Sequence, residues 1–134
     1  RRIVEVRQIR REQQGRFRNE LLNAYNGTCA ITGTDVPEVL QAAHINPYRG
    51  KKSQIVNNGI LLRADLHLLF DALLVSIEPD TLSVSLSDRL SNTIYHQYIN
   101  RRLAIPTQSA LAPSRELLAV HYRQFKRENR ILAS

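Results

Sequence analysis

Two histidines and an asparagine are the residues of this sequence whose types and spacing are best suited to chemistry. Asn58 follows His44 by fourteen residues, and His67 follows Asn58 by nine. All three lie in one stretch where short apolar runs alternate with turns. A histidine, with an ordinary pKa of about 6.5, is suited to removing a proton from water. A divalent metal stabilises developing oxyanion charge, and a neutral imidazole can bind that metal. The triad therefore indicates a metal-assisted phosphodiesterase site.

Four elements must position the triad, and the pattern of apolar residues and turns places them as follows. They are a strand at 39–45, a basic loop at 48–57, a second strand at 59–62 and a helix at 64–72. Pro47 ends the first strand because proline continues neither strand pairing nor a helix. Leu66, Leu69 and Phe70 have the spacing of one helix face. The pattern predicts His44 at a strand end and His67 on a short helix packed across the hairpin.

Helices are expected on both sides of this unit. Phe17, Leu21, Leu22 and Tyr25 form one apolar stripe, which predicts a helix over about 13–26 that stops near Gly27. Residues 1–9 alternate loosely and predict a short strand or the tail of an upstream element. Strands are expected at 73–77 and 82–86, joined by a turn at 78–81, and a helix is favoured at 94–99. Ser114 is expected to cap a last helix within about 113–130.

Size and composition fit one α+β domain of 134 residues, 43% hydrophobic, with a core at about 28–87 between the helical flanks. No apolar run approaches the ~20 residues of a membrane span, and no secretory signal follows the N-terminal arginines. We expect a piece excised from a longer protein. The lone cysteine, Cys29, excludes an internal disulfide and suits a buried position in a cytoplasmic protein.

The net charge of +7 is concentrated at the two ends of the chain. Residues 1–18 hold seven arginines and two glutamates, and residues 101–134 hold seven basic and two acidic side chains. Residues 19–100 carry five basic and eight acidic side chains. Basic flanks attract a polyanion and strengthen phosphate contacts, although solvated helix faces are the simpler interpretation of such charges.

The sequence resembles the HNH endonucleases, also called ββα-metal nucleases, and within them a subgroup found in restriction-type proteins. The resemblance covers roughly residues 13–126. It is carried by residues 14–18 (QGRFR), 25–33 (YNGTCAITG), 42–48 (AAHINPY) and 58–71 (NGILLRADLHLLFD). It implies a core made of a strand hairpin and a short helix. It also implies that His44 is the general base, that Asn58 orients the loop and the base, and that His67 binds the metal.

The sequence departs from the family pattern at two places. Many HNH enzymes have a second metal ligand immediately before the base, where this chain has Ala43. Asp65 is one candidate for that ligand, although it is also suited to capping the helix; Asp71 is another, although it is also suited to fixing the loop backbone. A four-cysteine zinc site found in many relatives is absent, because Cys29 stands alone.

The remaining polar residues divide into phosphate contacts and structural side chains. Four basic residues could be ordinary solvated charges or could contact DNA phosphates: Arg49, Lys51, Lys52 and Arg63. Their position in and near the loop favours phosphate contacts. His96 and His121 match no motif position, and His121 is expected to be a hydrogen-bonded packing residue.

The resemblance and the basic flanks together predict a divalent-metal-dependent DNA endonuclease domain, the cleavage module of a restriction or defence protein. The expected substrate is double-stranded DNA, cut to 5′-phosphate and 3′-hydroxyl ends. Mg²⁺ or Mn²⁺ is the expected cofactor, with Zn²⁺ or Ni²⁺ as alternatives. A fused or associated DNA-recognition domain and a homodimer both fit the sequence. The alternatives are a catalytically inactive HNH-like module that binds DNA and a protein-assembly domain that uses the terminal helices.

Overall fold

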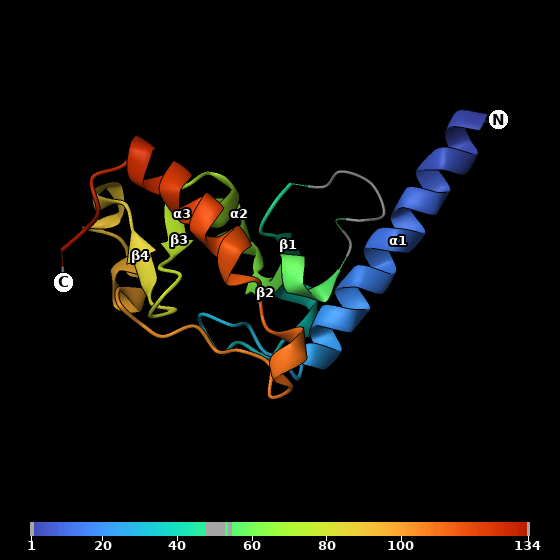
Figure 1. The fold of residues 1–134 in the computed structure, drawn as a ribbon, viewed down its shortest axis with the longest axis horizontal. Helices are drawn as coiled ribbons and strands as arrows, with labels where there is room; N and C mark the ends of the chain where they lie inside the picture. Colours follow the sequence, from blue (N-terminus) through green and yellow to red (C-terminus); the bar gives the residue numbers. More distant parts are fainter. Residues whose placement is uncertain (1, 48–52, 54, 134) are drawn as a thin grey trace.

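The computed structural model describes residues 2–47, 53 and 55–133, and its longest element is the N-terminal helix. Helix α1 spans Arg2–Ala24, and its first half projects from the body of the molecule (Figure 1). The strand expected within residues 1–9 is wrong, because these residues continue the helix. Arginine, glutamine and glutamate favour a helix, and the loose alternation of aliphatic residues has no sheet to pair with.

Helix α1 ends close to Gly27, as the sequence predicts, and the left-handed turn that ends it begins at Asn26. Asn26 has φ of 54° and Gly27 has φ of 64°. The Gly27 N–H donates to Leu22 O at 2.7 Å and the Asn26 N–H donates to Asn23 O at 3.3 Å. These two bonds form a Schellman motif, which satisfies carbonyls at the end of the helix.

The predicted hairpin and helix are confirmed in the centre of the molecule. Strand β1 (Leu40–His44) pairs antiparallel with β2 (Gly59–Arg63), and His44 lies opposite Gly59. Helix α2 (Ala64–Asp71) follows β2 without a connecting loop. Leu66 and Phe70 on α2 are fully buried, as their helical spacing predicts. This unit places the ends of β1 and α2 beside each other.

A second hairpin and the C-terminal helix complete the α+β fold. Strand β3 (Val75–Ile77) pairs antiparallel with β4 (Val84–Leu86), and helix α3 (Arg115–Glu128) packs on β3. The Ser114 hydroxyl accepts a hydrogen bond from the Leu117 N–H at 3.2 Å, so the predicted N-cap is confirmed. Residues Ile94–Tyr98 form a 3₁₀ helix where a helix was favoured.

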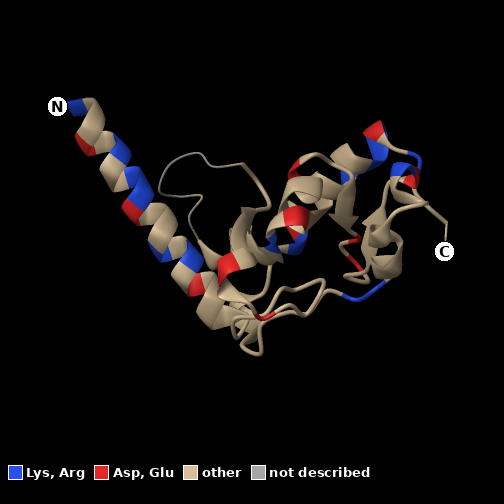
Figure 2. Ribbon diagram, turned by 180° about the vertical axis from the view of Figure 1, so that it is seen from behind, with Lys and Arg blue, Asp and Glu red and all other residues tan. Residues whose placement is uncertain are grey.

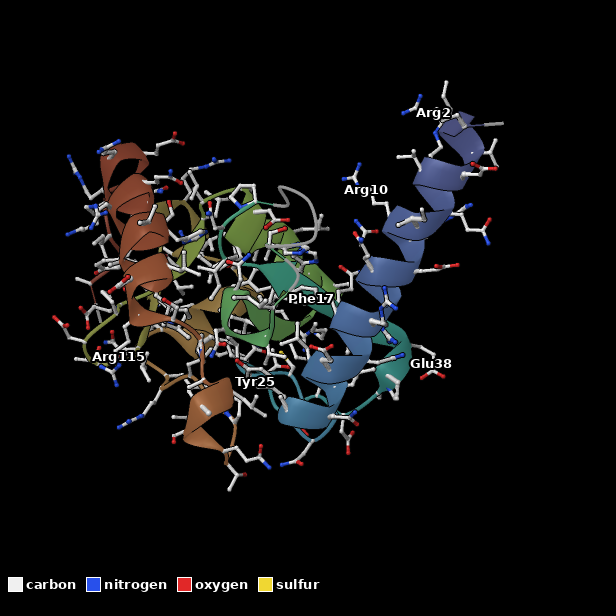
Figure 3. The ribbon with its side chains drawn as sticks, turned by 45° about the vertical axis from the view of Figure 1, so that its right-hand side comes forward. Arg2, Arg10, Phe17, Tyr25, Glu38 and Arg115 are labelled. Atoms are coloured by element: carbon white, nitrogen blue, oxygen red, sulfur yellow. The ribbon has the colours of Figure 1, made fainter. Side chains whose placement is uncertain are left out.

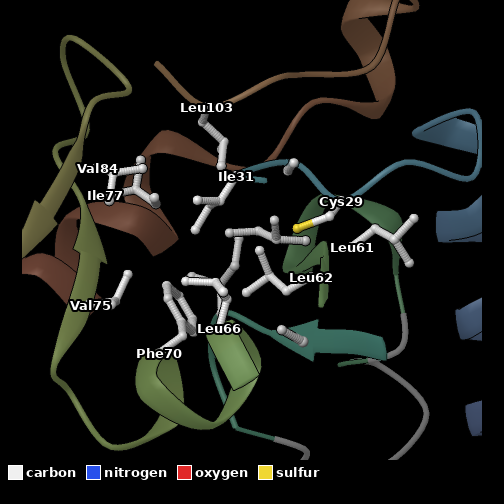
Figure 4. Packing of buried hydrophobic residues seen from close by; sticks show 14 of the residues in the cluster. Cys29, Ile31, Leu61, Leu62, Leu66, Phe70, Val75, Ile77, Val84 and Leu103 are labelled. Atoms are coloured by element: carbon white, nitrogen blue, oxygen red, sulfur yellow. The ribbon is translucent and has the colours of Figure 1, made fainter. Parts of the chain in front are cut away.

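The two hairpins and the helices share one apolar core (Figure 4). Cys29 is 1% exposed and belongs to the same buried cluster as Leu61 and Leu62 of β2. Its sulfur accepts hydrogen bonds from the Thr32 N–H at 3.4 Å and the Arg63 N–H at 3.2 Å. The predicted buried position of Cys29 is therefore confirmed. Among the described residues, no helix combines the length and apolar character needed to cross a membrane.

Candidate active site

A pocket of about 640 Å³ lies between α1, β1 and α2, and both histidines of the triad line it. His44 reaches the pocket from the end of β1, and His67 reaches it from the second turn of α2. Gln41 and Asp71 line the same pocket. The fold thus brings together two imidazoles that are separated by 22 residues in the sequence.

The imidazole of His44 is held against an aromatic ring of α1. The rings of His44 and Phe17 stack with their centroids 4.5 Å apart and their planes inclined by 12°. Phe17 is 1% exposed, and Figure 3 shows it on the part of α1 that turns towards the body. Because the phenyl ring covers one face of the imidazole, the orientation of the His44 ring is restricted.

This stacking depends on the lack of a side chain at Gly59, the residue paired with His44. A Cβ atom at Gly59 would lie 2.6 Å from Phe17 Cζ and 2.7 Å from Leu21 Cδ1. Such distances are shorter than van der Waals contact, so any side chain here would displace α1. Gly59 therefore allows α1 to approach β2 closely enough for Phe17 to reach His44.

Asn58 lies beneath the loop that follows His44 and is 3% exposed. Its Oδ1 accepts a hydrogen bond from the Asn46 N–H at 2.8 Å. Its Nδ2 donates to Asn46 O at 3.0 Å and to Ser53 O at 2.9 Å. The Asn58 carbonyl also accepts from the Ile45 N–H at 2.9 Å. The Asn58 side chain thus joins Asn46, at the start of this loop and two residues after His44, to Ser53 near its end.

His67 has a hydrogen-bonding partner at each ring nitrogen. Its Nδ1 lies 2.7 Å from Gln41 Oε1, and its Nε2 lies 3.1 Å from Asp71 Oδ2. An amide oxygen only accepts hydrogen bonds, so Nδ1 carries a proton. In the neutral ring, Nε2 then presents its lone pair to a carboxylate oxygen. A proton on Nε2 or a metal ion between the two atoms would make this contact favourable.

The donor set around His67 fits a divalent ion. Neighbouring ligands of an octahedral ion at 2.0–2.2 Å are about 3 Å apart, close to the separation of His67 Nε2 and Asp71 Oδ2, 3.1 Å. Asp71 is the more accessible of the two, with 57% of its side chain exposed. Within the described part of the chain, no three His, Cys, Asp or Glu side chains gather as a metal cluster. Two protein ligands with water and phosphate oxygens are sufficient for an ion such as Mg²⁺.

The structure does not bring Asp65, the other ligand expected from the sequence, to this pocket. Both its oxygens accept hydrogen bonds from Arg63, at 2.7 and 2.9 Å, and Tyr95 donates to Oδ2 at 3.0 Å. The hydrogen bonds from Arg63 hold the pKa of Asp65 below its usual value, and the same pairing raises the pKa of Arg63. Asp65, predicted to bind the metal, and Arg63, predicted to contact phosphate, therefore bind each other in a bidentate pair.

The other predicted residues are placed as follows. Arg49, Lys51 and Lys52 lie outside the described residues. His96 is exposed, and His121 is 7% exposed, stacked on Phe70 with ring centroids 3.7 Å apart. His121 Nε2 donates to Phe70 O at 2.9 Å, and Nδ1 accepts from Ser76 Oγ at 2.7 Å. This confirms His121 as a hydrogen-bonded packing residue, and burial lowers its pKa.

Sequence reasoning does not identify two residues that shape the site, Phe17 and Gln41. Phe17 has the spacing of a core residue, and that pattern does not show that its ring also covers His44. Gln41 is a polar residue in an apolar strand, three positions before His44, and this interruption is the available signal.

A strand hairpin leads directly into a helix, and one histidine at the strand end and one on the helix line the same pocket. This is the ββα arrangement expected of HNH nucleases. Residues 29–78 match the family model described as HNH endonuclease. That segment includes β1, β2, α2 and all three triad residues. The resemblance seen in the sequence is therefore confirmed over these residues, and it supports a nuclease domain.

Comparison with solved structures confirms the α+β fold over most of the chain. A structure described as a modification dependent TagI restriction endonuclease superposes with a TM-score of 0.61 at 18% sequence identity. The match covers 81% of this chain and 37% of that chain. No curated protein matches the sequence.

Proposed function

We propose that this chain is a divalent-metal-dependent DNA endonuclease domain that hydrolyses a phosphodiester. The observation that carries the proposal is the shared pocket. It holds a stacked histidine, His44, and a histidine–carboxylate pair, His67 and Asp71, whose spacing suits two ligands of a divalent ion. The family match over residues 29–78 supports the same chemistry.

In this proposal His44 is the general base. Its ring takes a proton from the attacking water, while Phe17 keeps the ring plane fixed. Asn58 acts without touching the reactants, because its hydrogen bonds to Asn46 and Ser53 hold the loop that begins beside His44. Fixed geometry of this kind places the base and the phosphate within reaction distance.

His67 and Asp71 would hold the divalent ion, with Gln41 holding the imidazole so that Nε2 faces the ion. When bound, the ion supplies Lewis-acid stabilisation of the charge that develops on the phosphate and the leaving oxygen. Asp71 replaces Asp65 as the proposed second ligand, because both oxygens of Asp65 are engaged by Arg63.

We further propose that the domain is the cleavage module of a restriction-type protein that acts on double-stranded DNA. The chain spans 37% of the TagI restriction endonuclease that it resembles in fold. Selection of the target would then fall to a recognition domain that is fused or associated. The basic ends of the chain would contribute sequence-independent affinity for the duplex.

The test is plasmid nicking with Mg²⁺, Mn²⁺ or EDTA, comparing wild type with His67→Ala. The exposed His96 provides a matched control, His96→Ala. We expect metal-dependent nicking by wild type and the control, and none by His67→Ala. Nicking by His67→Ala at the wild-type rate would contradict the assignment of the metal ligand.

A second function, DNA binding without cleavage, is favoured by one observation. Ala43 supplies no ligand beside the base, and its side chain is fully buried. Duplex binding by wild type without cleavage in any of several divalent ions, and without Mn²⁺ uptake, would establish this alternative.

A further inference from the structure

The first half of α1 is a helix whose described side chains are exposed. Residues 2–12 are all exposed, whereas burial on α1 is confined to Phe17 and Leu21. Figures 1 and 3 show this half extending beyond the rest of the fold, with Arg2 and Arg10 on it. Packing in the hydrophobic core therefore does not account for the residues of this half.

The acidic residues of α1 lie on one face of the helix together with Arg2 and Arg16, and the opposite face carries only basic charges. At about 100° of rotation per residue, Arg7, Arg11 and Arg18 fall within about 40° of one another, and Arg10 lies beside them. Glu5, Glu12 and Glu20 fall within about 80° on the far side. Figure 2 shows these basic and acidic positions alternating along the ribbon, as two facing stripes must. The arginine stripe is therefore free of acidic side chains.

This arginine stripe runs directly to the catalytic pocket. Gln14 lies on the same face between Arg11 and Arg18, and both Gln14 and Arg18 line the pocket that contains His44. Arg18 donates to Pro37 O at 2.8 Å and to Leu40 O at 3.3 Å, which fixes α1 against the start of β1. The stripe is thus held in a defined direction relative to the site.

The apolar residues of the projecting half do not form a competing surface. Ile3, Val4, Val6 and Ile9 are 67%, 59%, 59% and 53% exposed. They are spread over more than half the helix circumference, whereas docking into a hydrophobic groove needs one apolar stripe. The arginine face is therefore the better-defined surface, and its partner is a polyanion.

We propose that the arginine stripe binds backbone phosphates of the DNA duplex on one side of the scissile phosphate, through Arg7, Arg10 and Arg11. This rests on the proposed nuclease function. Arg7 and Arg18 are eleven positions apart on the helix, which corresponds to about 17 Å along its axis. That length corresponds to about five base pairs of B-form DNA at 3.4 Å each. Phosphate contacts of this kind position the duplex and do not read its sequence.

The test measures affinity for a short duplex as a function of salt, in a His44→Ala background that removes cleavage. Arg7→Gln/Arg11→Gln removes two charges from the stripe, and Arg2→Gln/Arg16→Gln removes two from the acidic face as the matched control. Each lost phosphate contact makes the plot of log K against log salt less steep by about 0.9. The stripe variant should therefore have a slope that is smaller in magnitude by about 1.8. Its affinity at low salt should fall at least tenfold, while the control retains the parent slope.

Each outcome separates this proposal from the proposed nuclease function. Equal slopes for the stripe variant and the parent overturn the phosphate-binding stripe, whatever the cleavage assays show. An equal loss of slope in stripe and control variants also overturns it, because general charge would then be responsible. If the stripe variant changes self-association in sedimentation and not DNA binding, the partner of α1 is a second copy and the proposal fails. A reduced slope in the stripe variant, together with no cleavage by the wild-type protein, supports the stripe and contradicts the nuclease.

Discussion

Substitution of Asn58 by alanine should weaken both the fold and the catalytic site. The change removes three side-chain hydrogen bonds, to Asn46 N, Asn46 O and Ser53 O, at a position only 3% exposed. A buried hydrogen bond contributes about 1 kcal/mol net, so the expected loss is about 3 kcal/mol. For a chain of 134 residues this corresponds to a fall in Tm of about 10 °C.

The catalytic effect should exceed what the lost stability explains. Without the Asn58 side chain, the hydrogen bonds that join Asn46 to Ser53 through it are lost, so the backbone two residues after His44 is less firmly held. A displacement of about 1 Å at a reacting group costs on the order of a hundredfold in rate. We expect the cleavage rate to fall by about this factor. The rate should be measured at least about 15 °C below the Tm of the variant, so that nearly all of the protein is folded.

The adjacent residue offers a matched control. The Asn57 side chain donates to Ala110 O and Ala112 O, both at 2.8 Å, and therefore fastens the C-terminal connector rather than the loop after His44. Asn57→Ala should cost about 1–2 kcal/mol of stability and leave the cleavage rate unchanged. Equal effects of the two variants on cleavage, or a stability loss below about 1 kcal/mol for Asn58→Ala, would refute the reasoning.

Three further predictions follow from individual contacts. Gly59→Ala should lower the free energy of unfolding in urea by about 1–3 kcal/mol, because its Cβ would lie 2.6 Å from an α1 side chain. Gly15→Ala should raise it by about 0.5–1 kcal/mol, because a Cβ at Gly15 would have no atom within 4 Å to clash with and alanine favours a helix. Gln41→Leu should weaken Mn²⁺ binding in calorimetry about 10–100-fold by releasing His67, and an unchanged Kd would contradict the role of Gln41. Burial lowers the pKa of His121, so protons bind the unfolded chain more tightly and stability should fall as pH drops below about 6.5. His121→Gln should flatten the profile of Tm between pH 7.5 and 5.5, and an equally steep profile would contradict this assignment.

The central unit of the fold is predictable from the sequence because local patterns define it. Pro47 ends the first strand, and the helical spacing of Leu66 and Phe70 indicates α2. The full length of α1 is harder to predict, since its first half buries nothing and lacks an amphipathic stripe. Its helix follows from intrinsic propensity, which is a weak guide when packing is absent.

The site is predictable in its residue types and less so in its contacts. His44 and His67 share a pocket, as the strand and helix assignment implies. The stacking of Phe17 on His44 joins residues 27 positions apart and depends on how closely α1 approaches β2, which no local pattern encodes. The engagement of Asp65 is likewise a matter of contacts, because Arg63 binds both of its oxygens.

The central claim is that His44 activates water in a metal-dependent phosphodiester hydrolysis. Its most direct test is the single-turnover cleavage rate of a labelled duplex by wild type and by His44→Ala, at saturating Mg²⁺ or Mn²⁺. Loss of a general base is expected to reduce the rate about 10²–10⁴-fold, with duplex binding preserved. Cleavage by His44→Ala at the wild-type rate, with the same dependence on the metal, would contradict the account.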